Sequence, residues 1–217
     1  MSRIVIVGGH GKIALRLARI LTAQQHQVTS LIRNPDHTAE VEATGATPVM
    51  ADVETLSTED LAGVISDHDA VVWSAGAGGG SPERTYAVDR DAAIRSMEAA
   101  SSAGVNRYVM VSYLGARADH GVDPENSFFA YAEAKAAADD HLRQATLDWT
   151  ILGPGGLTLD AGTGRIAVGD ELQGGKVSRD DVAAVAAAVL QGDHTIRKWI
   201  PFIGGDTPID EALAQLS

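Results

Sequence analysis

The chain has 217 residues, 45% of them hydrophobic, and its 17 basic and 29 acidic residues give a formal net charge of −12. This length fits one large domain with a buried core, and an acidic chain without a block of Lys or Arg argues against binding to nucleic acid or to anionic membranes. Cysteine is absent, which excludes disulfides and thiolate chemistry, and no segment resembles a signal sequence or a membrane span, so we expect a cytoplasmic protein.

A glycine-rich turn, Gly8-Gly-His-Gly-Lys-Ile13, follows the first expected strand, at 3–7, and precedes the first expected helix, at 13–24. Glycine permits a sharp turn and the close approach of a ligand, while unpaired N–H groups at the start of a helix attract a phosphate. The pattern is typical of the pyrophosphate site of a dinucleotide-binding fold, and another tight strand-to-helix connection is the alternative. Two glycine fingerprints fit the turn, one that begins at Gly8 and one that begins at Gly9.

Along the rest of the chain, short apolar runs alternate with segments that carry apolar residues at helical spacing. Strands without polar alternation are buried on both faces, and repeated βα units of this length indicate a doubly wound sheet. We therefore expect an α/β Rossmann fold with a doubly wound parallel sheet, in a single domain over residues 1–217. The further strands are expected at 27–33, 46–51, 70–74, 106–112, 148–152 and 199–203, and the further helices at 36–44, 58–66, 86–103, 128–146 and 182–190.

Arg33 ends the second expected strand, where NAD-binding folds carry an Asp or Glu that binds the ribose 2′-hydroxyl. A guanidinium suits a 2′-phosphate instead, because it binds the phosphate through two nitrogens and stacks on adenine, and no carboxylate is expected immediately beside it. We therefore expect NADP(H) in preference to NAD(H), with an ordinary exposed arginine as the alternative. His10 and Lys12 either add positive potential near the phosphates or remain solvated.

Two further segments follow strands at the same edge of the predicted sheet, which is where open α/β sheets bind ligands. Asp52 and Val53 follow the third strand, and the Asp52 carboxylate either accepts a hydrogen bond from the adenine amino group or binds backbone donors of its own loop. The run Ser74-Ala-Gly-Ala-Gly-Gly-Gly80 follows the fourth strand and has little side-chain bulk. We expect its first three residues beside the cofactor, with a plain flexible loop as the alternative.

Tyr131 and Lys135 lie four residues apart in the expected helix at 128–146 and therefore share a face of it. A tyrosine with a pKa of ~10 is a poor acid or base at neutral pH, and a nearby ammonium lowers that pKa. The pair therefore suits acid–base chemistry. The alternative is an exposed tyrosine beside a solvated lysine.

Glycines crowd residues 153–176, so we expect loops with short strands at most, before a helix capped by Ser178. We expect 153–178 and 204–217 to form a small substrate-side region. The substrate pocket is expected to be small and built from residues 114–130 and 155–176. Candidates for its lining, some of which core packing also explains, are Tyr113, Phe128, Phe129 and Leu157.

With these motifs the chain resembles the atypical branch of the short-chain dehydrogenase/reductase superfamily, whose NmrA-like members are small single-domain NAD(P)-binding proteins. The resemblance favours the fingerprint that begins at Gly8. It implies that Pro154 and Gly155 lie against the nicotinamide. The segments that carry it are 7–14, Arg33-Asn-Pro35, Ala51-Asp-Val53, 109–116, Tyr131-x-x-x-Lys135 and Gly153-Pro-Gly155.

In short-chain reductases the tyrosine is the proton donor or acceptor, the lysine binds the nicotinamide ribose and lowers the tyrosine pKa, and a serine orients the substrate oxygen. By resemblance these roles fall to Tyr131, Lys135 and Ser112. The chain departs from the family pattern in having Tyr113 where a second serine is common and Asp89 where an asparagine is common. Whether Ser112 or Tyr113 orients the substrate therefore stays open.

We thus expect an NADP(H)-dependent oxidoreductase that moves a hydride to or from a small carbonyl or alcohol, as a monomer or homodimer. The alternative is an NADP(H) sensor without turnover that acts through a protein partner; an epimerase or dehydratase fits a small pocket less well. No metal ligand is expected in the site. The expected catalytic residues are Ser112, Tyr131 and Lys135, and the expected cofactor-binding residues are Gly8, Gly9, His10, Gly11, Lys12, Ile13, Arg33, Asp52, Val53, Ser74, Ala75, Gly76, Lys135, Pro154 and Gly155.

Overall fold

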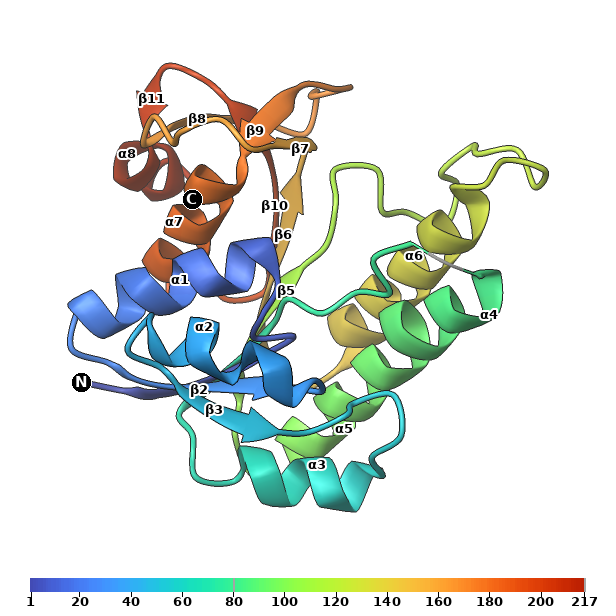
Figure 1. The fold of residues 1–217 in the computed structure, drawn as a ribbon. Coiled ribbons are helices and arrows are strands. Elements are labelled where there is room, and N and C mark those ends of the chain that lie inside the picture. Colours follow the sequence, from blue (N-terminus) through green and yellow to red (C-terminus); the bar gives the residue numbers. More distant parts are fainter. Residues whose placement is uncertain (80, 217) are drawn as a thin grey trace.

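The computed structural model describes residues 1–79 and 81–216, which form one domain around a nine-stranded, mostly parallel sheet (Figure 1). The strand order is β11-β8-β10-β6-β5-β4-β1-β2-β3, so β3 and β11 form the edges, and β7 pairs with β9 in a separate small sheet. The strands are β1 (Arg3–Val7), β2 (Gln27–Ile32), β3 (Thr47–Met50), β4 (Ala70–Trp73), β5 (Arg107–Val111), β6 (Asp148–Pro154), β7 (Gly156–Thr158), β8 (Arg165–Val168), β9 (Lys176–Ser178), β10 (Lys198–Gly204) and β11 (Thr207–Pro208).

Helices cover both faces of the sheet, as the strands without polar alternation require. One buried cluster joins α1, α2, α7 and α8 to the sheet, and a second joins α3, α5 and α6 to its other face. The helical segments are α1 (Lys12–Ala23), a 3₁₀ turn (Pro35–His37), α2 (Thr38–Glu42), α3 (Thr58–Ile65), α4 (Pro82–Thr85), a π-helical segment (Tyr86–Ala92), α5 (Ala93–Ser102), α6 (Phe129–Gln144), α7 (Arg179–Val189) and α8 (Ile209–Ala214).

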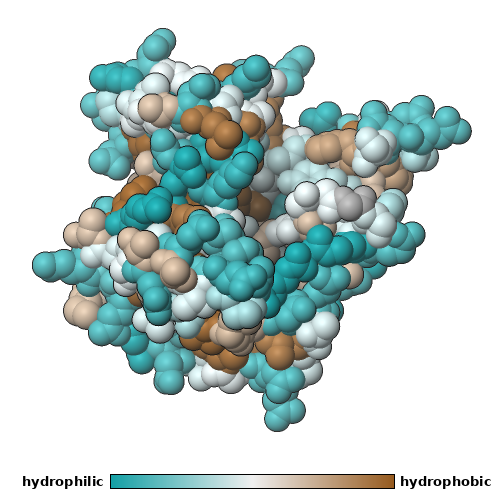
Figure 2. Space-filling view, viewed as in Figure 1, coloured by the Kyte–Doolittle hydropathy of each residue, from teal (hydrophilic) through white to brown (hydrophobic). Residues whose placement is uncertain are grey.

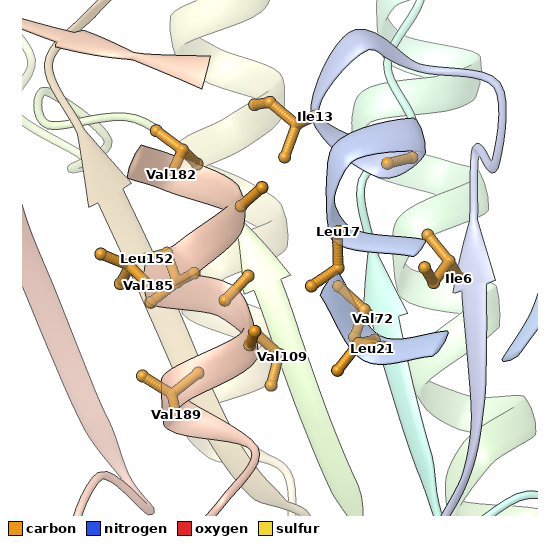
Figure 3. Close-up of a cluster of buried hydrophobic side chains, with 14 of the residues drawn as sticks. Ile6, Ile13, Leu17, Leu21, Val72, Val109, Leu152, Val182, Val185 and Val189 are labelled. Carbon is orange, nitrogen blue, oxygen red and sulfur yellow. The ribbon is translucent and has the colours of Figure 1, made fainter. Parts of the chain in front are cut away.

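The first cluster shows why α1 and α7 lie side by side on the sheet. Leu17 and Leu21 of α1 recur at helical spacing, and α7 presents Val185 and Val189 in the same way; all four are fully buried. Figure 3 shows these side chains gathered over the strands, with Val109 of β5 beneath α7. This packing fixes the start of α1, and with it the glycine-rich turn, against the sheet.

The fold class expected from the sequence is confirmed, and the differences are local. The expected helix at 86–103 consists of the π-helical segment Tyr86–Ala92 followed by α5, and α4 precedes it at Pro82–Thr85. The expected helix at 36–44 is a 3₁₀ turn followed by α2, and the strand expected at 148–152 continues to Pro154. The glycine-rich region contributes β7, β8 and β9, and β8 and β11 make the C-terminal edge of the sheet antiparallel.

Ser178 caps α7 as predicted, because its side chain accepts a hydrogen bond from the Asp181 N–H at 2.9 Å. None of the helices in the two described ranges combines the length and the apolar composition that crossing a bilayer requires.

Candidate cofactor and catalytic site

A cleft of about 320 Å³ opens at the carboxyl ends of β1, β2 and β4. β1 lies between β2 and β4. The chain runs from β1 to β2 and β3 on one side and then returns to β4 on the other side, and open α/β sheets bind ligands at such a reversal of strand order. The predicted cofactor residues that line it are Gly8, His10, Gly11, Arg33, Asp52, Val53, Ser74, Ala75 and Gly76, while Gly9, Lys12 and Ile13 lie outside this described lining.

The glycine-rich turn packs so closely on Ser30 and Ala75 that its first two residues have no room for a side chain. A Cβ on Gly8, whose φ is +80°, would lie 2.5 Å from the Ala75 Cα, and a Cβ on Gly9 would lie 2.4 Å from the Ser30 Cβ. In the described chain, Gly11 begins α1 without a side-chain cap, and the first turn of the helix holds no acidic residue. Free N–H groups and an uncompensated helix dipole attract anions. This turn therefore fits the pyrophosphate of a dinucleotide.

Two arginines meet in the cleft near the carboxyl ends of β2 and β3, where the sequence predicted only Arg33. Glu54 Oε2 lies 3.6 Å from Arg33 Nη1 and 3.4 Å from Arg84 Nε, and Arg84 Nη1 also donates to the Ala77 carbonyl at 2.6 Å. The expectation that no carboxylate lies beside Arg33 is wrong, because the loop after β3 brings Glu54 to it. Two guanidiniums thus share one carboxylate at this point, and Asp52 adds a second carboxylate to the lining.

Two histidines stack beside the arginines. The ring centroids of His10 and His37 are 3.5 Å apart with an interplanar angle of 11°, and His10 Nε2 lies 3.1 Å from Glu40 Oε2. Both rings line the cleft. Asp52 also lines it, while its Oδ1 accepts a hydrogen bond from the Glu54 N–H at 3.1 Å, so one of its oxygens binds a backbone donor of its own loop.

A second cavity, of about 950 Å³, lies at the carboxyl ends of β5 and β6. It brings together Ser112, Tyr131, Pro154 and Gly155, which the sequence placed on three separate segments. Its remaining lining comes from residues within 113–128 and 156–179, so a cavity lies where the substrate pocket was expected. Its volume of about 950 Å³ is larger than the small pocket expected from the sequence.

The Lys135 ammonium is buried and bonded to the end of β5. Its side chain is 1% exposed, and its ammonium donates to the Val111 carbonyl at 3.0 Å and lies 3.5 Å from the Met110 sulfur. Burial lowers the pKa of Lys135, while Asp139 and Asp89 raise it. Burial, together with the nearby carboxylates, raises the pKa of Tyr131. The predicted lowering of the tyrosine pKa is therefore not found.

Sequence reasoning missed Asp139, one turn after Lys135 on α6. Its Oδ2 accepts a hydrogen bond from Ser112 Oγ at 2.6 Å, and its Oδ1 is buried without a partner among the described residues. Burial raises the pKa of this carboxyl to about 6, against the opposing effects of Lys135 and Ser112. The spacing of four between two ionisable residues on one helix was a signal that the sequence contained.

Asp89, in the π-helical segment, is bonded to the glycine-rich run after β4, which lines the first cleft. It is 2% exposed, and its Oδ2 accepts a hydrogen bond from the Ala77 N–H at 2.9 Å. A Cβ on Gly76 would lie 3.0 Å from Asp89 Oδ1, so the glycine-rich run after β4 packs directly on this carboxyl. Burial raises the pKa of Asp89. A wider helical turn at a site is a frequent companion of function.

The comparisons with known proteins agree with this geometry. A family model described as NAD(P)H-binding matches residues 8–193. An uncharacterized sugar epimerase of Bacillus subtilis, YhfK, is 35% identical over 216 residues, which are 99% of this chain and 100% of the relative. A provisional NAD-dependent epimerase/dehydratase from Bacillus halodurans superposes with a TM-score of 0.91 at 34% identity, covering 99% and 100% of the two chains. The oxidoreductase ylbE of Lactococcus lactis superposes with a TM-score of 0.88 at 29% identity, covering 99% and 96%.

Proposed function

The chain belongs to the NAD(P)H-binding family, within the atypical short-chain dehydrogenase/reductase superfamily, and we propose that it is an NADP(H)-dependent oxidoreductase. It moves a hydride between the nicotinamide and a carbonyl or alcohol, and Tyr131 exchanges the proton. The observation that carries the proposal is the cavity at β5 and β6, in which Tyr131, Ser112 and the Pro154-Gly155 turn share one lining. Residues 153–178 and 204–217 supply the substrate side.

The preference for NADP(H) rests on the adenosine end of the first cleft. Arg33 and Arg84 share the carboxylate of Glu54, and a 2′-phosphate takes its place between them. Guanidiniums bind phosphate through two parallel hydrogen bonds. The glycine turn and the helix behind it hold the pyrophosphate, with His10 beside it. When bound, the nicotinamide supplies or accepts the hydride.

The chemistry that Tyr131 offers follows from its protonation. Because burial raises its pKa, the hydroxyl stays protonated through neutral pH and donates to the oxygen of a carbonyl as that oxygen gains charge. Reduction is therefore the favoured direction in this proposal. Lys135 is a buried cation near the carboxylates of Asp89 and Asp139. Its ammonium reaches from α6 to the end of β5, on the side proposed for the nicotinamide.

The test is NADPH oxidation, followed at 340 nm against aldehydes, ketones and quinones, in the wild-type protein and in Tyr131→Phe. We expect turnover that falls at least ~100-fold in the variant, the scale of a lost general acid. Binding of NADPH, measured by calorimetry, stays the same in both proteins. Turnover that survives in Tyr131→Phe contradicts the role of the tyrosine.

A sensor without turnover is the second candidate, and the burial of Lys135 favours it, because a side chain that is 1% exposed offers little contact to a bound nicotinamide ribose. Such a protein acts through a partner protein. NADPH binding that saturates while no compound of the panel is reduced supports the sensor and overturns the enzyme.

A further inference from the structure

The cavity at β5 and β6, which in the proposed function also takes the nicotinamide beside Pro154 and Gly155, is larger than a small carbonyl needs. Its volume of about 950 Å³ extends from Ser112 and Tyr131 out between the start of α6 and the strands β7 and β9. Figure 2 shows the surface hollowed between the lobe that carries these strands and the part of the molecule where α6 starts. Ligand sites of this size bury most of a molecule with several rings.

Three aromatic rings form one wall of this cavity. Phe128 lies 5.1 Å from Tyr131 and 5.5 Å from Tyr113 between ring centroids, and the two tyrosine rings are 5.4 Å apart. Phe128 is 43% exposed, and Leu157, which lines the same cavity, is 40% exposed. Large apolar side chains left open in a concave site mark a place where an apolar ligand is buried.

Glycine backbone forms another part of the lining. Gly155 and Gly175 are packed together so closely that a Cβ on Gly155 would lie 2.6 Å from the Gly175 carbonyl oxygen. Gly156 and Gly174 extend this surface. A wall without side chains accepts the face of a flat ring system, as it leaves no protruding group between the ring and the backbone.

The charges in the lining balance. Arg117 and Arg179 are matched by Asp170 and Glu171. Arg117 is already 3.3 Å from Asp119, and Arg179 donates to the Thr158 carbonyl at 2.8 Å. A diphosphate needs an excess of cations or of free N–H groups, and the side chains of this cavity do not supply that excess.

We infer that this cavity binds an uncharged, flat aromatic ring system with a conjugated carbonyl, such as a quinone, and not the nucleoside diphosphate of an activated sugar. The inference rests on the proposed function and names its substrate class. The step balances with NADPH as reductant: the quinone gains a hydride from NADPH and a proton from Tyr131, giving the hydroquinone and NADP⁺, and solvent returns the proton to the tyrosine.

The experiment measures binding by calorimetry, with menadione and UDP-glucose as probes. Two matched variants separate the cavity from the rest of the surface: Leu157→Ala removes a lining side chain, and Leu159→Ala removes a side chain that is 64% exposed and is not among the described lining residues. We expect menadione to bind more tightly than UDP-glucose. We expect Phe128→Ala and Leu157→Ala to weaken menadione binding roughly tenfold and roughly threefold, while Leu159→Ala leaves it unchanged.

Tighter binding of UDP-glucose, or equal affinities in Leu157→Ala and Leu159→Ala, overturns the inference. The proposed function fails separately: menadione that binds with the expected pattern but is not reduced by NADPH supports this cavity and contradicts the enzyme. Conversely, NADPH-dependent reduction of small aldehydes without menadione binding supports the enzyme and overturns the inference.

Discussion

Ser112 Oγ donates a hydrogen bond to Asp139 Oδ2 across 2.6 Å, and both side chains are buried. The serine proton therefore points at the carboxylate, and the serine turns a lone pair to the cavity. The family role of orienting a substrate oxygen as a donor is open to Ser112 only when Asp139 is protonated. Tyr113, whose buried hydroxyl has no partner among the described residues, lines the same cavity and is the other candidate for orienting the substrate oxygen.

Asp139 gives the folded protein a pH dependence. Its pKa is about 6 when folded, above the ordinary 3.8, so the folded state holds the proton more tightly than the unfolded state does. The stabilisation is present below pH 4 and is lost as the pH rises through 6, by about 3 kcal/mol. We expect Asp139→Asn to remove this loss between pH 4 and pH 7 in urea unfolding curves. Its neighbour Asp140→Asn should keep the wild-type slope, and an unchanged slope in Asp139→Asn contradicts the assignment.

Lys135 is the only basic side chain that is fully buried among the described residues. Replacing it with methionine leaves Asp89 and Asp139 buried without their cation, so we expect Lys135→Met to lower the free energy of unfolding at pH 7 by about 3 kcal/mol. Adding Asp139→Asn should recover part of that loss, because one of the uncompensated carboxylates is gone. Lys198→Met is the control, since the Lys198 ammonium is only half-buried, against the Leu216 carbonyl. Equal stabilities of Lys135→Met and the wild type argue against a charged Lys135.

Arg84 is expected to contribute to cofactor affinity as Arg33 does. We expect Arg84→Ala to weaken NADPH binding roughly tenfold and NADH binding much less, because only the 2′-phosphate needs the second guanidinium. Glu54→Gln should tighten NADPH binding, since the carboxylate competes with the phosphate for both arginines. Arg143→Ala, on α6 and paired with Asp140, is the control in these titrations. An equal loss for NADH and NADPH in Arg84→Ala would remove the case for phosphate selectivity.

Gly8 and Gly63 make a matched pair of glycines. We expect Gly8→Ala to destabilise the protein and to abolish NADPH binding, because its Cβ would collide with Ala75 at 2.5 Å and its φ of +80° disfavours any side chain. A Cβ on Gly63, inside α3, meets nothing within 4 Å, so Gly63→Ala should stabilise the protein by about 0.5–1 kcal/mol. Thermal unfolding and calorimetry measure both effects. If Gly8→Ala binds NADPH as tightly as the wild type does, the pyrophosphate does not bind at the glycine-rich turn.

The sequence predicted those parts of the molecule that local chemistry determines. The glycine turn, the alternating elements and the capping by Ser178 depend on neighbours in the chain, so a pattern of a few residues was enough. The location of the second cavity followed from strand ends, because parallel strands bring their carboxyl ends to one edge. Its size did not, since it depends on how far β7 and β9 stand from α6.

Long-range pairing explains what the sequence left out. Arg84 contacts Glu54, which lies thirty positions earlier in the chain. A local spacing of residues cannot predict such a contact. No sequence pattern predicts the π-helical turn at Tyr86–Ala92, yet this turn places the Asp89 carboxylate against the Ala77 N–H. The surroundings of Lys135 are another case: the pattern predicted the helix face that it shares with Tyr131 but not the Val111 carbonyl that accepts its hydrogen bond.

Both outer strands of the large sheet are short and contain a proline, Pro48 in the four-residue β3 and Pro208 in the two-residue β11. Proline has no N–H, so neither rim offers an unbroken row of donors on which a strand from another molecule could continue the ladder. The protein is thereby protected against growth into fibres or ribbons through its sheet. A homodimer of this chain would have to form through surfaces other than these two edges.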